Sequence, residues 1–191
     1  MSATMTSALW DLSRGAGVAA LVTFTVSLVL GIFTRSGREA LGLGRFGLAE
    51  VHRTAALTGV GLVAVHLVTL LFDPYAQLRL VDLVFPFLGS YRPLWLGLGT
   101  LAVDLLAVVT VVSLLRDKVG PKVFKAVHWA TYALWPVALF HSVGTGTDAR
   151  TLWFDAIAVA CIGAVTAAVA WRMSGSFSGR GWHRLPRQVA R

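Results

Sequence analysis

The chain has 191 residues, of which 56% are hydrophobic and only 14% are charged, and its formal net charge is +8. Soluble domains usually carry about 25% charged residues, so this composition and the mean hydropathy of +0.71 exclude an ordinary soluble domain. The basic residues lie between apolar runs rather than together on one face, which argues for contact with membrane lipid and against a nucleic-acid partner. The single cysteine, Cys161, excludes a disulfide framework and an iron–sulfur site.

Five apolar stretches are long enough to cross a bilayer as helices, which need about 20 residues each. They cover approximately residues 12–33, 49–72, 93–115, 122–144 and 152–172. A shorter apolar piece at 80–89 contains Asp82 and Pro86, and we expect it to lie at the membrane interface. The sequence therefore predicts an all-α integral membrane helix bundle over residues 1–175, followed by a basic cytoplasmic tail over 176–191.

The distribution of lysine and arginine predicts the orientation of this bundle. The first and third loops hold four basic residues each and the tail holds five, out of 17 in the chain. The remaining four basic residues fall on the other side of the bundle, and they are Arg14, Arg79, Arg92 and Arg150. Because cytoplasmic loops carry the excess of positive charge, we expect the N-terminus outside the cell, the C-terminus in the cytoplasm, and a plasma-membrane location.

Four histidines lie in the second and fourth apolar stretches, two in each. His52 and His66 are 14 residues apart, and His128 and His141 are 13 apart. At about 1.5 Å per residue, each pair spans roughly 20 Å, from near one membrane face to near the other. Both helices run in the same direction, so depth matches His52 with His128 inside and His66 with His141 outside. Thirteen residues of an ideal helix miss the starting face by about 140°, and we expect a kink at Pro136 to correct the phase.

These histidines need partners, because imidazole is costly in hydrocarbon unless it is paired, hydrogen-bonded or bound to a metal. Two helices that each carry an upper and a lower histidine can hold two stacked metal centres, and haem iron with two axial imidazoles fits that arrangement. The sequence contains no CxxCH motif, so the haems are expected to be b-type. The alternative is that the histidines hydrogen-bond between helices or lie at the interface, but four at matched depths favour the metal.

Three segments carry a resemblance to a known family. They are LAEVHRTAALTGVGLVAVHLVTLLFDPY, LVDLVFPFLGSYRPLWLGLGTLAVDLL and KAVHWATYALWPVALFHSVGTGTD. From about Ala8 to Trp171 the chain resembles the ferric reductase-like transmembrane domain, which includes ferric reductases, the membrane core of NADPH oxidases and the haem subunit of bacterial methionine sulfoxide repair systems. The resemblance is strongest to small actinobacterial members. It implies two b-type haems with the four histidines as axial ligands, and electron transfer from the cytoplasm to an outer acceptor.

Larger relatives have six helices and a cytoplasmic module that binds flavin and nicotinamide. This sequence shows no glycine-rich dinucleotide fingerprint after a plausible strand. We therefore expect electrons from a separate flavoprotein, from free reduced flavin or from quinol, with FMN or FAD present only through such a partner. Two alternatives stay open: a haem-carrying membrane anchor of a larger redox complex, and a non-haem transporter of protons or metal ions.

Five further residues are candidates for a part in the site. Arg14, at the outer end of the first stretch, could neutralise a haem propionate or extend to the lipid headgroups. Arg53 could play the corresponding inner role and Arg92 an outer one, with an interfacial anchor as the alternative for Arg92. Trp129 could line a porphyrin face or serve helix packing. Asp104 lies near the middle of its stretch, and it is a candidate proton relay or quinone contact, or else a neutral carboxyl hydrogen-bonded to a neighbour.

Glycines in the second and third stretches leave room for rings or neighbouring backbones to approach closely. They are Gly59, Gly61, Gly97 and Gly99.

Overall fold

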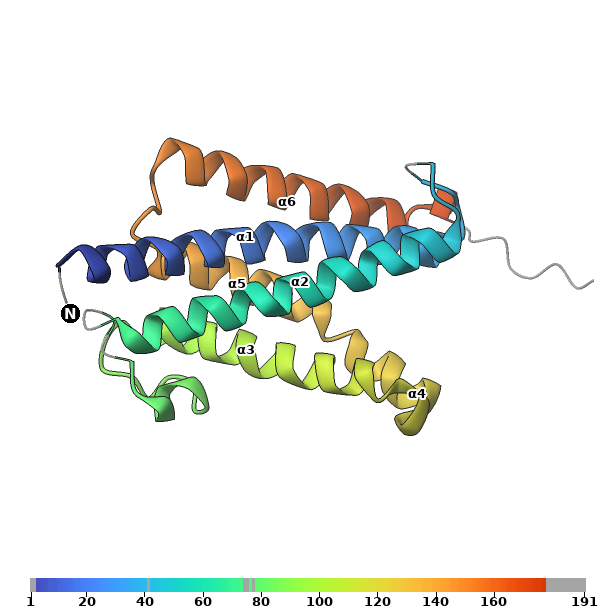
Figure 1. Ribbon diagram of the computed structural model, residues 1–191. Coiled ribbons are helices and arrows are strands. Elements are labelled where there is room, and N and C mark those ends of the chain that lie inside the picture. Colours follow the sequence, from blue (N-terminus) through green and yellow to red (C-terminus); the bar gives the residue numbers. More distant parts are fainter. Residues whose placement is uncertain (1–2, 41, 74–75, 77, 178–191) are drawn as a thin grey trace, which may run out of the picture.

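The structure is a computed structural model that describes residues 3–40, 42–73, 76 and 78–177. Within these residues every regular element is a helix, so the predicted all-α membrane bundle is confirmed (Figure 1). Only the first two residues of the predicted tail over 176–191 are described, so the rest of it lies outside the described residues.

Four of the described helices are long and apolar enough to cross a membrane, and they confirm the first, second, third and fifth predicted spans. They are α1 (Ala3–Ser36), α2 (Arg45–Phe72), α3 (Pro93–Leu114) and α6 (Leu152–Met173). Local chemistry sets two of their ends. Gly37 follows α1 with a φ of 69°, which is the left-handed conformation that commonly ends a helix. Pro93 occupies the first turn of α3, where its missing N–H costs nothing.

The fourth predicted span is wrong as a single helix. The structure divides it into α4 (Arg116–His128) and α5 (Thr131–Thr145), with Trp129 and Ala130 between them. At 15 residues, α5 is shorter than a full crossing. Within α4 the backbone also bends at Gly120, whose φ of 79° is open to glycine at little cost.

The hydrophobic core lies where α1, α5 and α6 meet. It consists of Leu21, Trp135, Leu139, Phe154, Ala158, Cys161 and Val165. The indole N–H of Trp135 donates to the Thr25 hydroxyl at 2.9 Å, so the one polar group of this large buried ring is satisfied. Helix α1 is thus the central element: it packs against α2, α5 and α6, while α3 packs mainly on α5 (Figure 1).

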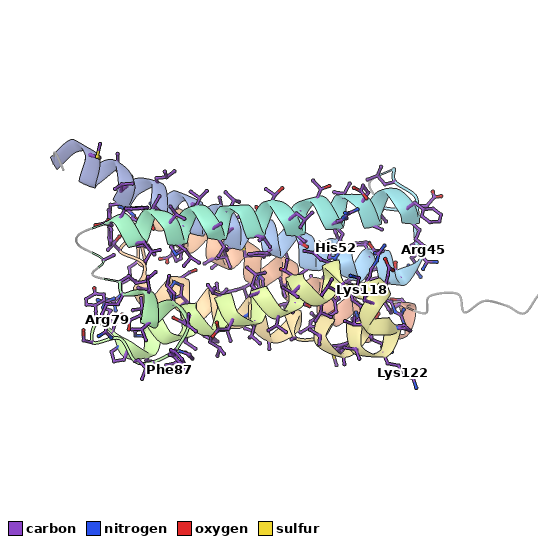
Figure 2. The ribbon with its side chains drawn as sticks, turned by 60° about the horizontal axis from the view of Figure 1, so that its bottom comes forward. Arg45, His52, Arg79, Phe87, Lys118 and Lys122 are labelled. Atoms are coloured by element: carbon purple, nitrogen blue, oxygen red, sulfur yellow. The ribbon has the colours of Figure 1, made fainter. Side chains whose placement is uncertain are left out.

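The two ends of the bundle differ in charge. Arg45, Lys118 and Lys122 lie at one end, which we call the basic end, and His52 lies near it (Figure 2). Arg79 and Phe87 lie at the opposite end, which we call the far end (Figure 2). The cytoplasmic location of the basic end stays a prediction from the positive-inside rule.

The short apolar piece at the far end does not cross the bundle. It begins with the 3₁₀ helix η1 (Leu80–Leu83), where Arg79 and the buried Asp82 form a reciprocal capping box. The Arg79 guanidinium, bonded to the Asp82 carboxylate at 2.9 Å, lowers the pKa of Asp82 below its usual value. The Thr100 hydroxyl donates to the Asp82 carbonyl at 2.6 Å and so fastens this piece to α3.

Candidate metal centres

The four histidines meet in the two pairs that their depths predict. The ring centroids of His52 and His128 are 6.1 Å apart, and the ring planes cross at 80°. The ring centroids of His66 and His141 are 6.5 Å apart, with planes that cross at 81°. We call these the basic-end pair and the far-end pair. Each joins α2 to the segment made by α4 and α5.

Helix α1 holds both histidines of α2 through backbone carbonyls. The Nδ1 atom of His52 lies 2.8 Å from the Ser27 carbonyl oxygen, and the Nδ1 atom of His66 lies 2.8 Å from that of Ser13. A carbonyl oxygen can only accept a hydrogen bond, so Nδ1 carries the proton in both rings. The two serine hydroxyls lie 3.2 Å from the same nitrogens. Each ring is thereby oriented with its Nε2 lone pair unused.

The far-end histidine of α5 is held in the same way by α3. The Nδ1 atom of His141 lies 2.8 Å from the Trp95 carbonyl oxygen and 3.4 Å from the Thr145 hydroxyl. In this ring too, Nδ1 donates and Nε2 stays available. Ligating histidines in metalloproteins usually donate their other N–H to a carbonyl or carboxylate, which fixes the tautomer and the ring orientation.

A glycine four residues after the accepting carbonyl makes each of these contacts possible. Gly31 follows Ser27, Gly17 follows Ser13, and Gly99 follows Trp95. In a helix the carbonyl of residue i lies beside residue i+4, so a side chain there would cover the second lone pair. A Cβ at Gly31 or Gly17 would lie 3.2 or 3.1 Å from the bound imidazole, and one at Gly99 only 2.5 Å from it.

Sequence reasoning did not find the serine and glycine anchors of α1, although the sequence does contain a signal for them. Ser13 and Gly17 recur 14 residues later as Ser27 and Gly31, and 14 residues is also the spacing of the histidines on α2. Two neighbouring helices with the same repeat present the same pair of groups at both depths. Of the glycines expected to allow close approach, Gly99 receives His141, Gly97 receives Phe87 and Gly59 receives the Phe24 ring, whereas Gly61 faces open space.

The fourth histidine reaches its partner through the break between α4 and α5. The amides of Ala130, Tyr132 and Ala133 bond to carbonyls three residues back rather than four. Each residue in a 3₁₀ turn advances the chain by about 120° around the helix axis, instead of about 100° in an α-helix. The turn therefore makes up part of the rotation by which His128 and His141 would otherwise miss a common face. Part of the correction therefore lies at Trp129–Ala130, and a contribution from a kink at Pro136 within α5 stays a prediction.

The spacing of both pairs fits imidazoles that share one metal ion. A metal-bound nitrogen lies about 2 Å from the metal and about 1 Å from its own ring centre, so two opposed imidazoles have centroids about 6 Å apart. No group of three or more histidine, cysteine or acidic side chains gathers around one point in the described residues. A structural zinc ion takes four protein ligands. A haem iron needs only two, because the porphyrin supplies the others.

A comparison with known protein families gives a match over more than half of the chain. Residues 16–139 match the family described as the ferric reductase like transmembrane component. The chain belongs to this family. It is accordingly a multi-pass membrane protein and a membrane redox electron-transfer module. The matched range includes His52, His66 and His128 and ends two residues before His141. No curated protein and no solved structure matches the chain.

In this ferric reductase-like chain, Arg14 forms an ion pair that sequence reasoning did not foresee. Its guanidinium makes two hydrogen bonds to the Asp148 carboxylate, one of them 2.6 Å long from Nε. Asp148 belongs to the loop between α5 and α6 and is 9% exposed. The pair fastens this loop to α1 at the far end. The propionate role of Arg14 stays a prediction, and Asp148 competes for the same guanidinium.

Arg14→Ala should destabilise the ferric reductase-like fold, because it leaves the Asp148 carboxylate buried without its partner. Losing one partner of a buried charge-assisted hydrogen bond costs about 2–3 kcal/mol. The thermal midpoint of the detergent-solubilised protein measures this effect. Arg150→Ala is the matched control, since Arg150 lies in the same loop, is exposed and forms no ion pair within the described residues. Equal midpoints for the two variants would contradict the assignment.

The other predicted cofactor contacts lie at the surface. Arg53 is exposed on α2. Arg92 is exposed and donates to the Gly144 carbonyl at 2.9 Å, which joins the start of α3 to the end of α5. Trp129 is 51% exposed, and the Arg172 guanidinium lies 4.9 Å from its ring centroid. The structure brings none of these three against a histidine pair in the described residues, and their contact with a cofactor stays a prediction.

Asp104 lies near the middle of α3, as predicted. It is half-buried and makes no hydrogen bond or ion pair with any described residue, so the neutral, hydrogen-bonded alternative finds no partner there. It is five residues from Gly99 and so lies on a different face of α3 from the His141 contact. Its role as a proton or quinone contact stays a prediction.

Proposed function

We propose that this chain is a b-type di-haem cytochrome that moves electrons across the plasma membrane. One haem is held by His52 and His128 and the other by His66 and His141. Electrons enter at the basic end, on the cytoplasmic side, and leave at the far end to an outer acceptor such as a ferric complex. The four histidines are metal ligands in this proposal.

One observation carries the proposal. Both pairs combine a ring separation suited to one shared metal with Nδ1 atoms that are already engaged, in three of the four rings, by backbone carbonyls. A histidine that served only to hydrogen-bond between helices would have no need of a second imidazole at this distance from its ring. The stacking of two such pairs along one helix supports passage of charge across the membrane.

A bound haem supplies one-electron chemistry through its ferrous and ferric states. The chain's own residues define where that chemistry takes place. The carbonyls of Ser13, Ser27 and Trp95 fix the imidazole tautomers and raise ligand basicity. Apolar helices exclude water, so that a charge in the site is stabilised by these fixed groups rather than by solvent.

The basic end is suited to receive an anionic donor. Exposed cations lie on α4 and at the start of α2. They are Arg45, Arg53, Arg116, Lys118, Lys122 and Lys125. Such a surface attracts acidic flavoproteins and the phosphate of reduced FMN through long-range electrostatics. We propose a separate flavoprotein or free reduced flavin as the donor, with quinol as the alternative. The same cations also face the anionic headgroups of the inner leaflet.

Transmembrane electron transfer in sealed vesicles tests the function. The haem-loaded chain is reconstituted into liposomes that enclose ferricyanide, and dithionite, a donor that needs no docking site, is added outside. We expect ferricyanide inside to be reduced well above the rate in empty vesicles and in vesicles that hold haem-free chain. A rate equal to that of the empty vesicles would refute the proposal. Reduced FMN and a soluble quinol, compared in place of dithionite, then identify the class of donor.

A further inference from the structure

His128 differs from the other three histidines in its surroundings. Its Nδ1 atom is buried and has no hydrogen-bond partner among the described residues. Each of the other three rings donates from Nδ1 to a backbone carbonyl on a neighbouring helix and lies against a glycine. His128 has no such carbonyl. Its own backbone carbonyl accepts from the Thr131 hydroxyl at 2.8 Å, which constrains the chain there but leaves the ring free.

The contact that does hold the ring comes from the same short helix. Phe124, one turn earlier on α4, stacks on His128 with a centroid distance of 5.1 Å and an interplanar angle of 24°. His128 is the last residue of α4, beside the break at Trp129–Ala130. Among the described residues, helix α4 packs mainly against α3, its neighbour in the chain. A segment with few tertiary contacts opens locally at low free-energy cost.

These observations show that the basic-end pair and the far-end pair differ in how firmly their imidazole rings are held. A ligand that leaves its metal must break every other bond that orients it. Either far-end imidazole would lose a hydrogen bond to a carbonyl and would have to leave a slot formed by a glycine. His128 would lose only a stacking contact that can move with α4. The two centres thus differ in one ligand, although they look equivalent in the sequence.

We propose that His128 is an exchangeable ligand, and that the position of its imidazole is a binding site for a small neutral molecule of the carbon monoxide class. The proposal rests on the haem ligation proposed above. It gives the basic-end centre a coordination position that opens without unfolding the bundle, while the far-end centre stays closed by two anchored rings.

Carbon monoxide titration of the dithionite-reduced, haem-loaded chain tests this proposal by absorption spectroscopy. We expect about one carbon monoxide bound per two haems. Two double variants assign the centre. His66→Ala with His141→Ala removes the far-end ligands and should keep the binding, whereas His52→Ala with His128→Ala should abolish it.

The rate of binding gives a second test in a chain that retains all four ligands. Phe124→Ala should accelerate carbon monoxide binding several-fold, because it removes the stacking contact on His128. Phe140→Ala is the matched control: this ring is 58% exposed, precedes His141 and stacks on no histidine in the described part of the chain. The control should bind at the rate of the unmodified chain.

The outcomes are distinct. A chain that carries two haems but binds no carbon monoxide, or binds it at the far end or equally at both ends, would overturn the proposal and leave the cytochrome function intact. Equal acceleration by Phe124→Ala and Phe140→Ala would also contradict it. A chain that takes up no haem would overturn both the proposal and the function on which it rests.

Discussion

His66→Ala should leave the chain with one haem and should lower electron transfer across vesicles by more than about 100-fold. Loss of a group that merely supports a metal ligand typically costs about 10–100-fold, and loss of the ligand itself should cost more. The basic-end pair does not include His66 and should keep its haem. Haem per polypeptide and the dithionite-reduced spectrum measure the first effect, and the ferricyanide vesicle assay measures the second.

Val65→Ala is the control for that variant. Val65 precedes His66 on α2, is 40% exposed and lies outside the core cluster. It should retain both haems and the full rate of transfer. Two haems retained in His66→Ala would show that His66 is not a ligand, and would contradict the assignment of the far-end pair as a metal site.

Gly99→Ala should have nearly the same effect as the loss of a ligand, although Gly99 carries no side chain. An added Cβ would lie 2.5 Å from Cε1 and 2.6 Å from Nδ1 of His141, closer than real contacts allow. The ring must then move away from α3 and lose its bond to the Trp95 carbonyl. We expect loss of the far-end haem, or a low-spin signal shifted from that of the unmodified chain, while the basic-end haem is unaffected.

Gly61→Ala provides a matched comparison, because the same substitution on a neighbouring spanning helix meets nothing within 4 Å. Replacing glycine by alanine in a helix stabilises it by up to about 1 kcal/mol, so this variant should retain both haems and melt no lower than the unmodified chain. An unaltered far-end haem in Gly99→Ala would show that His141 is not held as the structure describes. Electron paramagnetic resonance of the oxidised protein resolves the two low-spin centres.

The depth of each histidine could be predicted from the sequence, whereas its rotation about the helix could not. The rise per residue is nearly the same in all helices, so a spacing of 13 or 14 residues fixes which histidines share a level. Rotation depends on local hydrogen bonding. The amides around Trp129–Ala130 bond three residues back rather than four, and this 3₁₀ turn divides the fourth predicted span.

The groups that hold the rings were harder to predict, because they are backbone carbonyls. A carbonyl belongs to every residue, so only its exposure marks it out, and that exposure depends on a glycine four positions later. The ion pair of Arg14 with Asp148 was missed for a related reason: its partners are 134 residues apart, and only the folded chain brings the loop after α5 to the start of α1.

The most direct test of the account is the amount and type of haem in the purified chain. The protein is expressed with adequate haem supply, purified in detergent, and its haem is quantified per polypeptide beside oxidised and dithionite-reduced absorption spectra. We expect two b-type haems per chain, both low-spin in the oxidised state. A colourless chain would contradict this expectation and would favour a transporter that uses the same histidines, and a single haem would show that one of the two pairs does not bind metal.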